Sequence, residues 1–449
     1  MTLDSSARLE VDPLIEDPAT RIIVCCGAGG VGKTTTAAAL GVRAAERGRK
    51  VVVLTIDPAR RLAQSMGIDS LDNTPRRVEG IKGDGQLHAM MLDMKRTFDE
   101  IVEAHADAER ARAILGNPFY QSLSAGFAGT QEYMAMEKLG QLRARDEWDL
   151  IVVDTPPSRS ALDFLDAPKR LGSFLDGKFI KLLMTPAKMG GRAGMKFLNV
   201  GMSMMTGTLG KLLGGQLLRD VQTFVAAMDT MFGGFRTRAD ATYRLLQAPG
   251  TAFLVVAAPE RDALREAAYF VERLAAEDMP LAGLVLNRVH GSGAARLSAE
   301  RALAAAENLD EAGIVDQWPG KTGVRDTAAV SPESPSAGRS PEARPAADRP
   351  AAGAPEVVTQ VPEASAEQQS VAAAGQTTQQ MTAGLLRLHA ERMQVLAREQ
   401  RTRDRFTALH PEVAVAEVPA LPGDVHDLTG LRTIGDRLAT GGSARAGAA

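Results

Sequence analysis

The chain has 449 residues, of which 45% are hydrophobic and 24% charged, and a formal net charge of −3. These values are typical of a globular protein with room for one or two domains. A charge this close to zero gives no indication of the basic face that nucleic acid requires. The acidic N-terminus is unlike a signal peptide, and no apolar run reaches the roughly eighteen residues of a membrane span. We therefore expect a cytoplasmic protein, with peripheral contact to a membrane left open.

Residues 1–18 are expected to form a mobile tail, and from residue 19 apolar runs alternate with helical segments. The runs are continuous rather than alternating, as in strands buried on both faces of a parallel sheet. They are RIIVCC from Arg21, KVVVLTID from Lys50, DLIVVD from Asp149, AFLVVAAP from Ala252 and LAGLVLNRV from Leu281. This alternation predicts an α/β fold with a doubly wound, mostly parallel sheet.

Two helical insertions are expected within the 19–320 domain, near 97–148 and 168–246. The second is rich in methionine, for example Met195, Met202, Met204 and Met205. Methionine suits surfaces that accept varied hydrophobic partners, but at helical spacing it also fills ordinary cores. A groove for a hydrophobic client and a packed core both remain open.

Residues 321–380 lack aromatic residues, Leu, Ile and Met, and contain prolines among Ala, Ser, Glu and Gln. Such a segment buries too little apolar surface to offset its ordering entropy, so we predict a disordered loop. Order is expected to resume over 381–438, with a helix and a short strand, VAVAEVPAL, that complete the domain. Residues 439–449 are expected to be a second mobile tail.

The strongest motif is GAGGVGKTT, which begins at Gly27 directly after the first predicted strand and opens a helix. In that context the glycines let backbone N–H groups surround phosphates, and the helix N-terminus adds favourable partial charge. Lys33 supplies a cation to the phosphates, and the hydroxyl of Thr34 can bind magnesium. The motif predicts a binding site for ATP with Mg2+.

Two aspartates end predicted strands. Asp154 closes DLIVVD, where a carboxylate would lie close to magnesium-bound phosphate, or would cap a turn. Asp57 ends a different strand, in LTIDPARRL. There it is placed either to orient an attacking water or to cap the following helix.

The order of the motifs resembles that of arsenite-pump and tail-anchored-protein-targeting ATPases, which are ArsA-like, anion-transporting members of the deviant P-loop ATPases. The matching motifs are GAGGVGKTT, TIDPARRLAQSM, DLIVVDTPPSRSALDFL, AAPE, GLVLNRV and VPALPGDVHDL. They cover most of residues 19–290 and 381–438. The resemblance implies a Rossmann-like P-loop NTPase fold, a dimer that encloses the nucleotide, and two switch segments that couple hydrolysis to opening and closing.

The resemblance also implies roles for single residues. Lys33 and Asp57 are the expected catalytic residues, with Asp57 orienting the water, and Thr34 and Asp154 the expected magnesium partners. Asn287 matches an adenine-reading asparagine, although an asparagine after a strand also forms turns. The loop 419–422 is expected to lie against the adenine. The residues expected to bind the nucleotide are Gly27, Gly29, Gly30, Val31, Gly32, Lys33, Thr34, Thr35, Asn287, Pro419 and Leu421.

Several positions depart from the family pattern. The lysine that reaches across the family's dimer is replaced by Ala28, so one charge expected at the transition state is missing. Arg61, beside Arg60, stands where the first switch usually has asparagine, and either supplies charge or lies on a solvated helix face. In the second switch, Arg159 and Ser160 replace a Gly-His pair. ATP binding is thus a firmer expectation than fast hydrolysis.

The only two cysteines, Cys25 and Cys26, are adjacent in the first predicted strand. Because neighbours in a strand point to opposite faces, a disulfide between them is not expected, and we interpret both as buried hydrophobes. Arsenite would need several converging thiolates, and zinc would need further cysteine or histidine ligands in register. No arsenite or zinc site is therefore expected.

The sequence as a whole favours an ATP-dependent conformational switch, an ATPase that acts on a hydrophobic or membrane-associated client. One alternative is a weakly active regulatory subunit of a heterodimer whose partner is a lysine-bearing paralogue, as Ala28 indicates. The other is a partition or cell-division positioning ATPase.

Overall fold

The computed structural model describes residues 7–56, 61–118, 120–121, 130–156, 237–315 and 366–440. The chain divides into two compact units. The first comprises Met1–Gly293 and Leu396–Ala449 and contains the sheet, and the second is Ala294–Val395.

An eight-stranded sheet forms the centre of the first unit, in the order β3-β4-β2-β5-β1-β6-β7-β8. Every neighbouring pair is parallel except β3 with β4. The predicted doubly wound, mostly parallel fold is confirmed. The strands are β1 Ile22–Cys26, β2 Lys50–Thr55, β3 Arg76–Arg77, β4 Gln86–Met91, β5 Leu150–Asp154, β6 Thr251–Ala257, β7 Leu281–Val289 and β8 Val415–Pro419.

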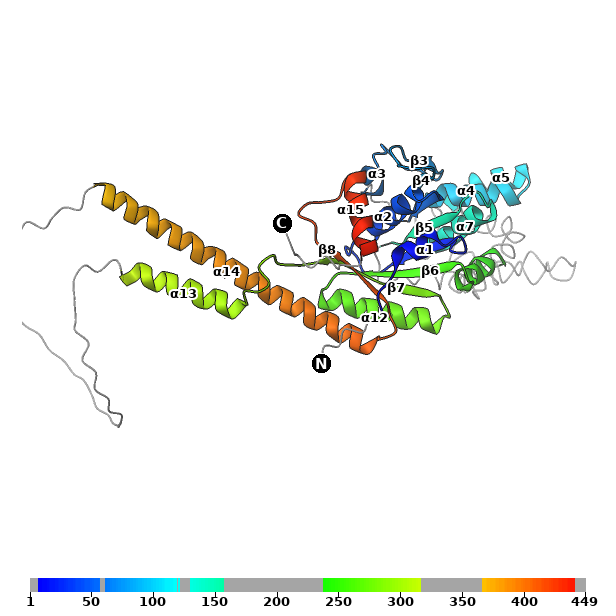
Figure 1. The fold of residues 1–449 in the computed structure, drawn as a ribbon. Coiled ribbons are helices and arrows are strands. Elements are labelled where there is room, and N and C mark those ends of the chain that lie inside the picture. Colours follow the sequence, from blue (N-terminus) through cyan, green and yellow to red (C-terminus); the bar gives the residue numbers. More distant parts are fainter. Residues whose placement is uncertain are drawn as a thin grey trace, which may run out of the picture. The chain divides into compact units, whose positions relative to one another are not determined.

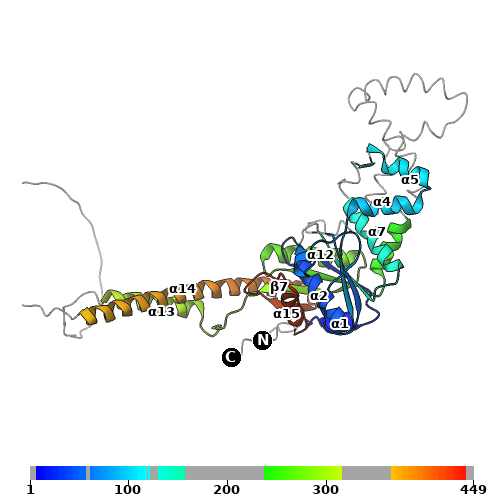
Figure 2. The same cartoon turned by 90° about the horizontal axis from the view of Figure 1, so that it is seen from above.

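Helices cover both faces of this sheet (Figures 1 and 2). Along β1, Ile23 and Cys25 belong to the core shared with α1, α2 and α15, whereas Val24 and Cys26 belong to the core shared with α4, α7 and α12. This alternation explains why the strands are apolar at every position. The helices are α1 Val11–Glu16, α2 Lys33–Glu46, α3 Arg61–Ser65, α4 Met94–His105, α5 Ala108–Leu115, α7 Thr130–Ala144, α12 Arg261–Ala276 and α15 Leu428–Thr440.

The expected mobile tail at 1–18 is wrong for the described residues 7–18. Leu9 pairs with Val415 through its backbone N–H, and α1 buries Val11 and Ile15 completely against the sheet. Asp12 of α1 accepts hydrogen bonds from Arg43 of α2 at 2.5 and 2.8 Å. A helix of six residues is too short to show a clear apolar period, which is why the sequence did not predict it.

The predicted insertion at 97–148 contains α4, α5 and α7. Only the end of the second insertion is described, where residues 237–247 form a helix. The methionines of that insertion, together with Arg159 and Ser160, lie outside the described residues.

Two long helices make up most of the described second unit. They are α13, Ala299–Val315, and the part of α14, Ala366–Leu409, that precedes Leu396. They lie side by side (Figure 1), and the buried methyl groups of Ala302, Ala306, Ala383 and Ala390 are on these helices. The expected disorder over 321–380 is wrong from Ala366 onward, because α14 begins there. The composition of 366–380 is rich in alanine and glutamine, which favour helix without needing a large apolar face.

The C-terminal segment completes the first unit. The predicted strand VAVAEVPAL is present as β8, which pairs with β7 at the edge of the sheet. The following helix, α15, was not predicted, and it packs on α2 through Leu431, Ile434 and Leu438.

Candidate nucleotide-binding site

The loop between β1 and α2 has a conformation that only glycine allows at two positions. Gly27 has φ 146°, and a Cβ there would lie 2.1 Å from the carbonyl oxygen of Val256. Gly32 has φ 97° at the N-cap of α2, and a Cβ there would lie 2.2 Å from Nδ2 of Asn287. The loop therefore holds its shape through glycines at both ends, with Gly29, Gly30 and Val31 between them.

Lys33 is the first residue of α2, and only 5% of it is exposed. Its Nζ donates a hydrogen bond to the carbonyl oxygen of Ala28 at 2.8 Å, so the side chain curls back over its own loop. The ammonium group and the first N–H groups of α2 both lie at this loop. An anion is the ligand that such an arrangement favours.

The carboxylate of Asp154 joins three segments of the chain. Its Oδ2 accepts a hydrogen bond from Oγ1 of Thr34 at 2.7 Å and another from Oγ1 of Thr55 at 2.8 Å. Asp154 is fully buried at the end of β5, Thr34 belongs to α2, and Thr55 ends β2. The predicted partners Thr34 and Asp154 are thus together.

The sequence did not identify Thr55, because nothing in it shows that β2 and β5 are neighbours. A threonine at the end of a buried strand was the only available signal.

Asp57, the expected water-orienting residue, lies outside the described residues, as does Arg60. The last described residue before it is Ile56, whose N–H donates to the carbonyl oxygen of Asp154 at 3.1 Å. The chain that leads to Asp57 therefore starts beside the buried carboxylate.

Asn287 lies at the end of β7 and is 7% exposed. Its Nδ2 donates to the carbonyl oxygen of Val31 at 2.8 Å, and its Oδ1 accepts from the N–H of Arg288 at 3.0 Å. Arg288 has φ 61°. An amide has a second donor and further acceptor capacity, so these contacts leave groups for a base. Asn287 is therefore next to the phosphate loop.

Pro419 ends β8 beside β7, and Ala420 donates its N–H to the carbonyl oxygen of Val289 at 2.9 Å. Leu421 follows, half-buried against the same core as the phosphate loop. Since β1, β7 and β8 run in one direction, these residues and the loop lie at one edge of the sheet, the carboxyl edge where parallel α/β folds bind ligands.

Oxygen donors for a cation are present at this edge. Mg2+ prefers oxygen ligands and commonly takes one or two from the protein while the phosphates supply others. The hydroxyl of Thr34 and the carboxylate of Asp154, 2.7 Å apart, fit that requirement. In the described parts of the chain, no group of three or more His, Cys, Asp and Glu residues is placed to hold a metal ion.

Both cysteines are buried beneath the loop and unpaired with each other. Burial raises the pKa of Cys26 to about 12 and raises that of Cys25 well above its ordinary value. The thiols therefore stay protonated near neutral pH and behave as the small hydrophobes that the sequence indicated.

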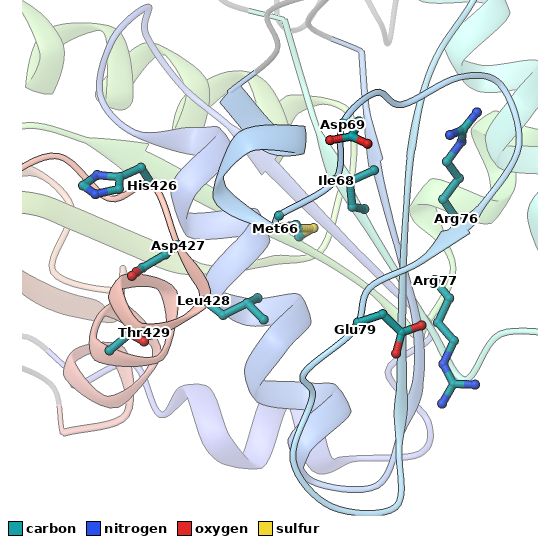
Figure 3. Close-up of a pocket in the computed structure, with 11 residues that line it drawn as sticks. Met66, Ile68, Asp69, Arg76, Arg77, Glu79, His426, Asp427, Leu428 and Thr429 are labelled. Carbon is teal, nitrogen blue, oxygen red and sulfur yellow. The ribbon is translucent and has the colours of Figure 1, made fainter.

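A separate cavity of about 620 Å3 contains none of the expected nucleotide-binding residues (Figure 3). In the figure, Arg76 and Arg77 point away from each other on one side, and His426 and Asp427 lie on the other. Acidic, basic and apolar residues all line this cavity, so the lining does not favour one class of ligand. It is lined by Met66, Gly67, Ile68, Asp69, Arg76, Arg77, Glu79, His426, Asp427, Leu428 and Thr429.

Among the helices that the structure describes, none combines the length and the apolar composition needed to cross a bilayer.

Comparison with known proteins shows similarity to ATPases. Residues 20–302 match the family described as anion-transporting ATPase. The chain is 29% identical to ATPase GET3 of Malassezia globosa, over 38% of this chain and 49% of that relative. It is 25% identical to ATPase GET3 of Podospora anserina, over 64% of this chain and 78% of the relative. It is 27% identical to the ATPase ASNA1 homolog of Cryptosporidium parvum, over 59% of this chain and 63% of the relative.

Proposed function

Since the chain belongs to the anion-transporting ATPase family, we propose that it binds ATP with Mg2+ at the phosphate loop and uses hydrolysis to ADP and phosphate to switch its own shape. This change of shape acts on a hydrophobic or membrane-associated client protein. A protein of this kind has different affinities for its client before and after hydrolysis, since only a difference between the two states lets the nucleotide drive release.

The observation that carries the proposal is the pair of hydrogen bonds on Oδ2 of Asp154. Thr34 comes from the helix that follows the phosphate loop, and Thr55 comes from the strand that leads to Asp57. If the hydrogen bond from Thr34 changes, the position of the Asp154 carboxylate changes too, and the hydrogen bond from Thr55 to the same oxygen is affected. The geometry supports communication between the phosphate loop and both expected switch segments.

The expected roles follow from these positions. Thr34 and Asp154 would hold Mg2+, which when bound supplies positive charge at the phosphate oxygens. Lys33 would neutralise phosphate charge from the other side of the loop, and Asp57 would orient the attacking water. The amide of Asn287 and the loop with Pro419 would contact the adenine.

We expect the affinity for an apolar helix to depend on the nucleotide. The protein is titrated with a fluorescent, apolar helical peptide of about twenty residues, once with a non-hydrolysable ATP analogue and once with ADP. A working switch gives dissociation constants that differ by about tenfold or more, equivalent to at least about 1.4 kcal/mol of coupling. A polar peptide of equal length is the control.

Equal affinities with both nucleotides would contradict the switch, even if the peptide binds tightly. If the peptide binds in no nucleotide state, the proposal that the client is hydrophobic is wrong.

A second proposal concerns the partner. Ala28 lies in the phosphate loop with 8% of its surface exposed, and its carbonyl oxygen accepts from Lys33. Its methyl side chain has no charge to extend to a partner's nucleotide. We propose that the protein works as a heterodimer with a lysine-bearing paralogue, which supplies that charge at the site held by this chain.

We expect the isolated protein to hydrolyse ATP slowly, and Ala28→Lys to hydrolyse it about tenfold faster or more in single-turnover assays, because a cation positioned on transition-state charge has a large effect. The rival source of charge is Arg61, so Arg61→Ala is the comparison and should change little. Brisk turnover by the isolated protein that Arg61→Ala abolishes would favour an active homodimer instead.

A further inference from the structure

The backbone of Ile56 is held from two sides. Its N–H donates to the carbonyl oxygen of Asp154 at 3.1 Å, and its own carbonyl oxygen accepts from Nε2 of Gln131 at 3.0 Å. The side chain of Ile56 is 2% exposed. Gln131 is the second residue of α7, so this contact joins the end of β2 to the first helical insertion, near 97–148.

A hydrogen bond to this carbonyl has a particular consequence for the next residue. The peptide bond is planar, so the carbonyl group of Ile56 and the backbone nitrogen of Asp57 lie in one plane. An anchor on the carbonyl oxygen therefore fixes the orientation in which the chain enters Asp57. Without it, this peptide plane loses one of the contacts that hold it.

The helix that provides this anchor is itself firmly held. Tyr133, Met134 and Met136 of α7 are buried in the core, each at most 2% exposed. Glu137 accepts a hydrogen bond from Arg238 at 2.8 Å, and Lys138 donates one to Glu100 of α4 at 3.1 Å.

Burial is the main cause of a lowered pKa for Lys138, although Glu100 opposes it by favouring the charged form. One side chain of each pair is buried and its partner is partly exposed, at 5% for Lys138 and 26% for Glu100. Removing the exposed partner would leave a buried charge unpaired, so these contacts resist displacement of the helix.

The contacts of α7 connect two different parts of the molecule. Arg238 lies in the helix 237–247, at the end of the second insertion. Gln131 lies less than two turns of α7 before Glu137. α7 thus contacts both the end of that insertion and the residue that precedes Asp57.

We propose that Gln131 is a positioning residue for ATP hydrolysis. Its amide holds the peptide plane that leads from Ile56 to Asp57, so that a displacement of α7 is transmitted to the backbone that precedes Asp57. The proposal rests on the function proposed above for Asp57, and it identifies the contact through which the helical insertion controls hydrolysis.

The test replaces Gln131 by methionine, which has nearly the same length and no N–H donor. We expect kcat for ATP to fall about tenfold, since a slightly misplaced catalytic group has a large effect on rate. The dissociation constant for an ATP analogue should remain within twofold. Gln141→Met is the matched control, because Gln141 is half-buried on the same helix about 15 Å further along. It should leave both quantities unchanged, and melting curves check that both variants are folded.

A double-mutant cycle with Asp57→Asn tests whether Gln131 affects kcat through Asp57. If Gln131 acts through Asp57, adding Gln131→Met to Asp57→Asn causes no further loss of kcat. The proposal is overturned if Gln131→Met turns over like the wild type, or if it causes the same tenfold loss in both backgrounds. A normal kcat for Asp57→Asn alone is a different failure: it rejects the proposed role of Asp57, and the role of Gln131 is rejected with it.

Discussion

Replacing Lys33 by alanine should remove the stabilisation of the protein by nucleotide. At a hundredfold excess of Mg-ATP over its dissociation constant, binding at one site adds about 2.7 kcal/mol to the free energy of unfolding, which raises the melting temperature. The variant lacks the ammonium group that lies at the phosphate loop, so its melting curve should not respond to Mg-ATP or Mg-ADP. Hydrolysis should be lost with binding.

Differential scanning fluorimetry with and without nucleotide measures this effect. The variant is compared with itself, because removal of a buried charge also changes the stability of the nucleotide-free protein. Lys95→Ala is the control, since the Lys95 side chain is 51% exposed on α4. A nucleotide shift of wild-type size in Lys33→Ala would overturn the assignment of the site.

The substitution Asp57→Asn should separate binding from chemistry. Asparagine keeps the size of the side chain but loses the carboxylate that is proposed to orient the attacking water. We expect kcat to fall about a hundredfold or more, the range found for the loss of a positioned acid–base group. Affinity for an ATP analogue should be nearly intact, because Asp57 does not belong to the phosphate loop.

Steady-state phosphate release and a fluorescent ATP analogue measure the two quantities. Asp69→Asn provides the control, because Asp69 follows α3 and lines the separate cavity of Figure 3. Affinity and turnover that decrease together would show that Asp57 is a binding or structural residue.

The central sheet could be predicted from the sequence because its strands are buried on both faces. Continuous apolar runs located β1, β2, β5, β6 and β7, and the motifs correctly placed the chain in its family. β4 was missed because Gln86 is exposed and His88 half-buried, which interrupts the apolar run. The two-residue β3 exists only through its pairing with β4 and leaves no pattern of its own.

The candidate site was only partly predictable, for a related reason. The spacing of Gly27, Gly32 and Lys33 specifies the loop locally, since the glycines are required by the backbone itself. Thr55 and Gln131 enter through contacts between elements that are distant in sequence, 99 residues apart for Thr55 with Asp154 and 75 for Gln131 with Ile56. No local pattern reports such contacts, because they depend on the order of the strands and the packing of α7.

The position of β8 has a consequence for how the chain folds as it leaves the ribosome. β8 pairs with β7, yet about 125 residues separate them along the chain, among them the whole second unit. At a synthesis rate of about 5 to 20 residues per second, β8 is synthesised roughly 6 to 25 s after β7. During that interval the unpaired N–H and C=O groups of β7 form an open edge, which invites pairing with other nascent chains. Newly made protein should therefore need protection by a chaperone until translation has passed Pro419.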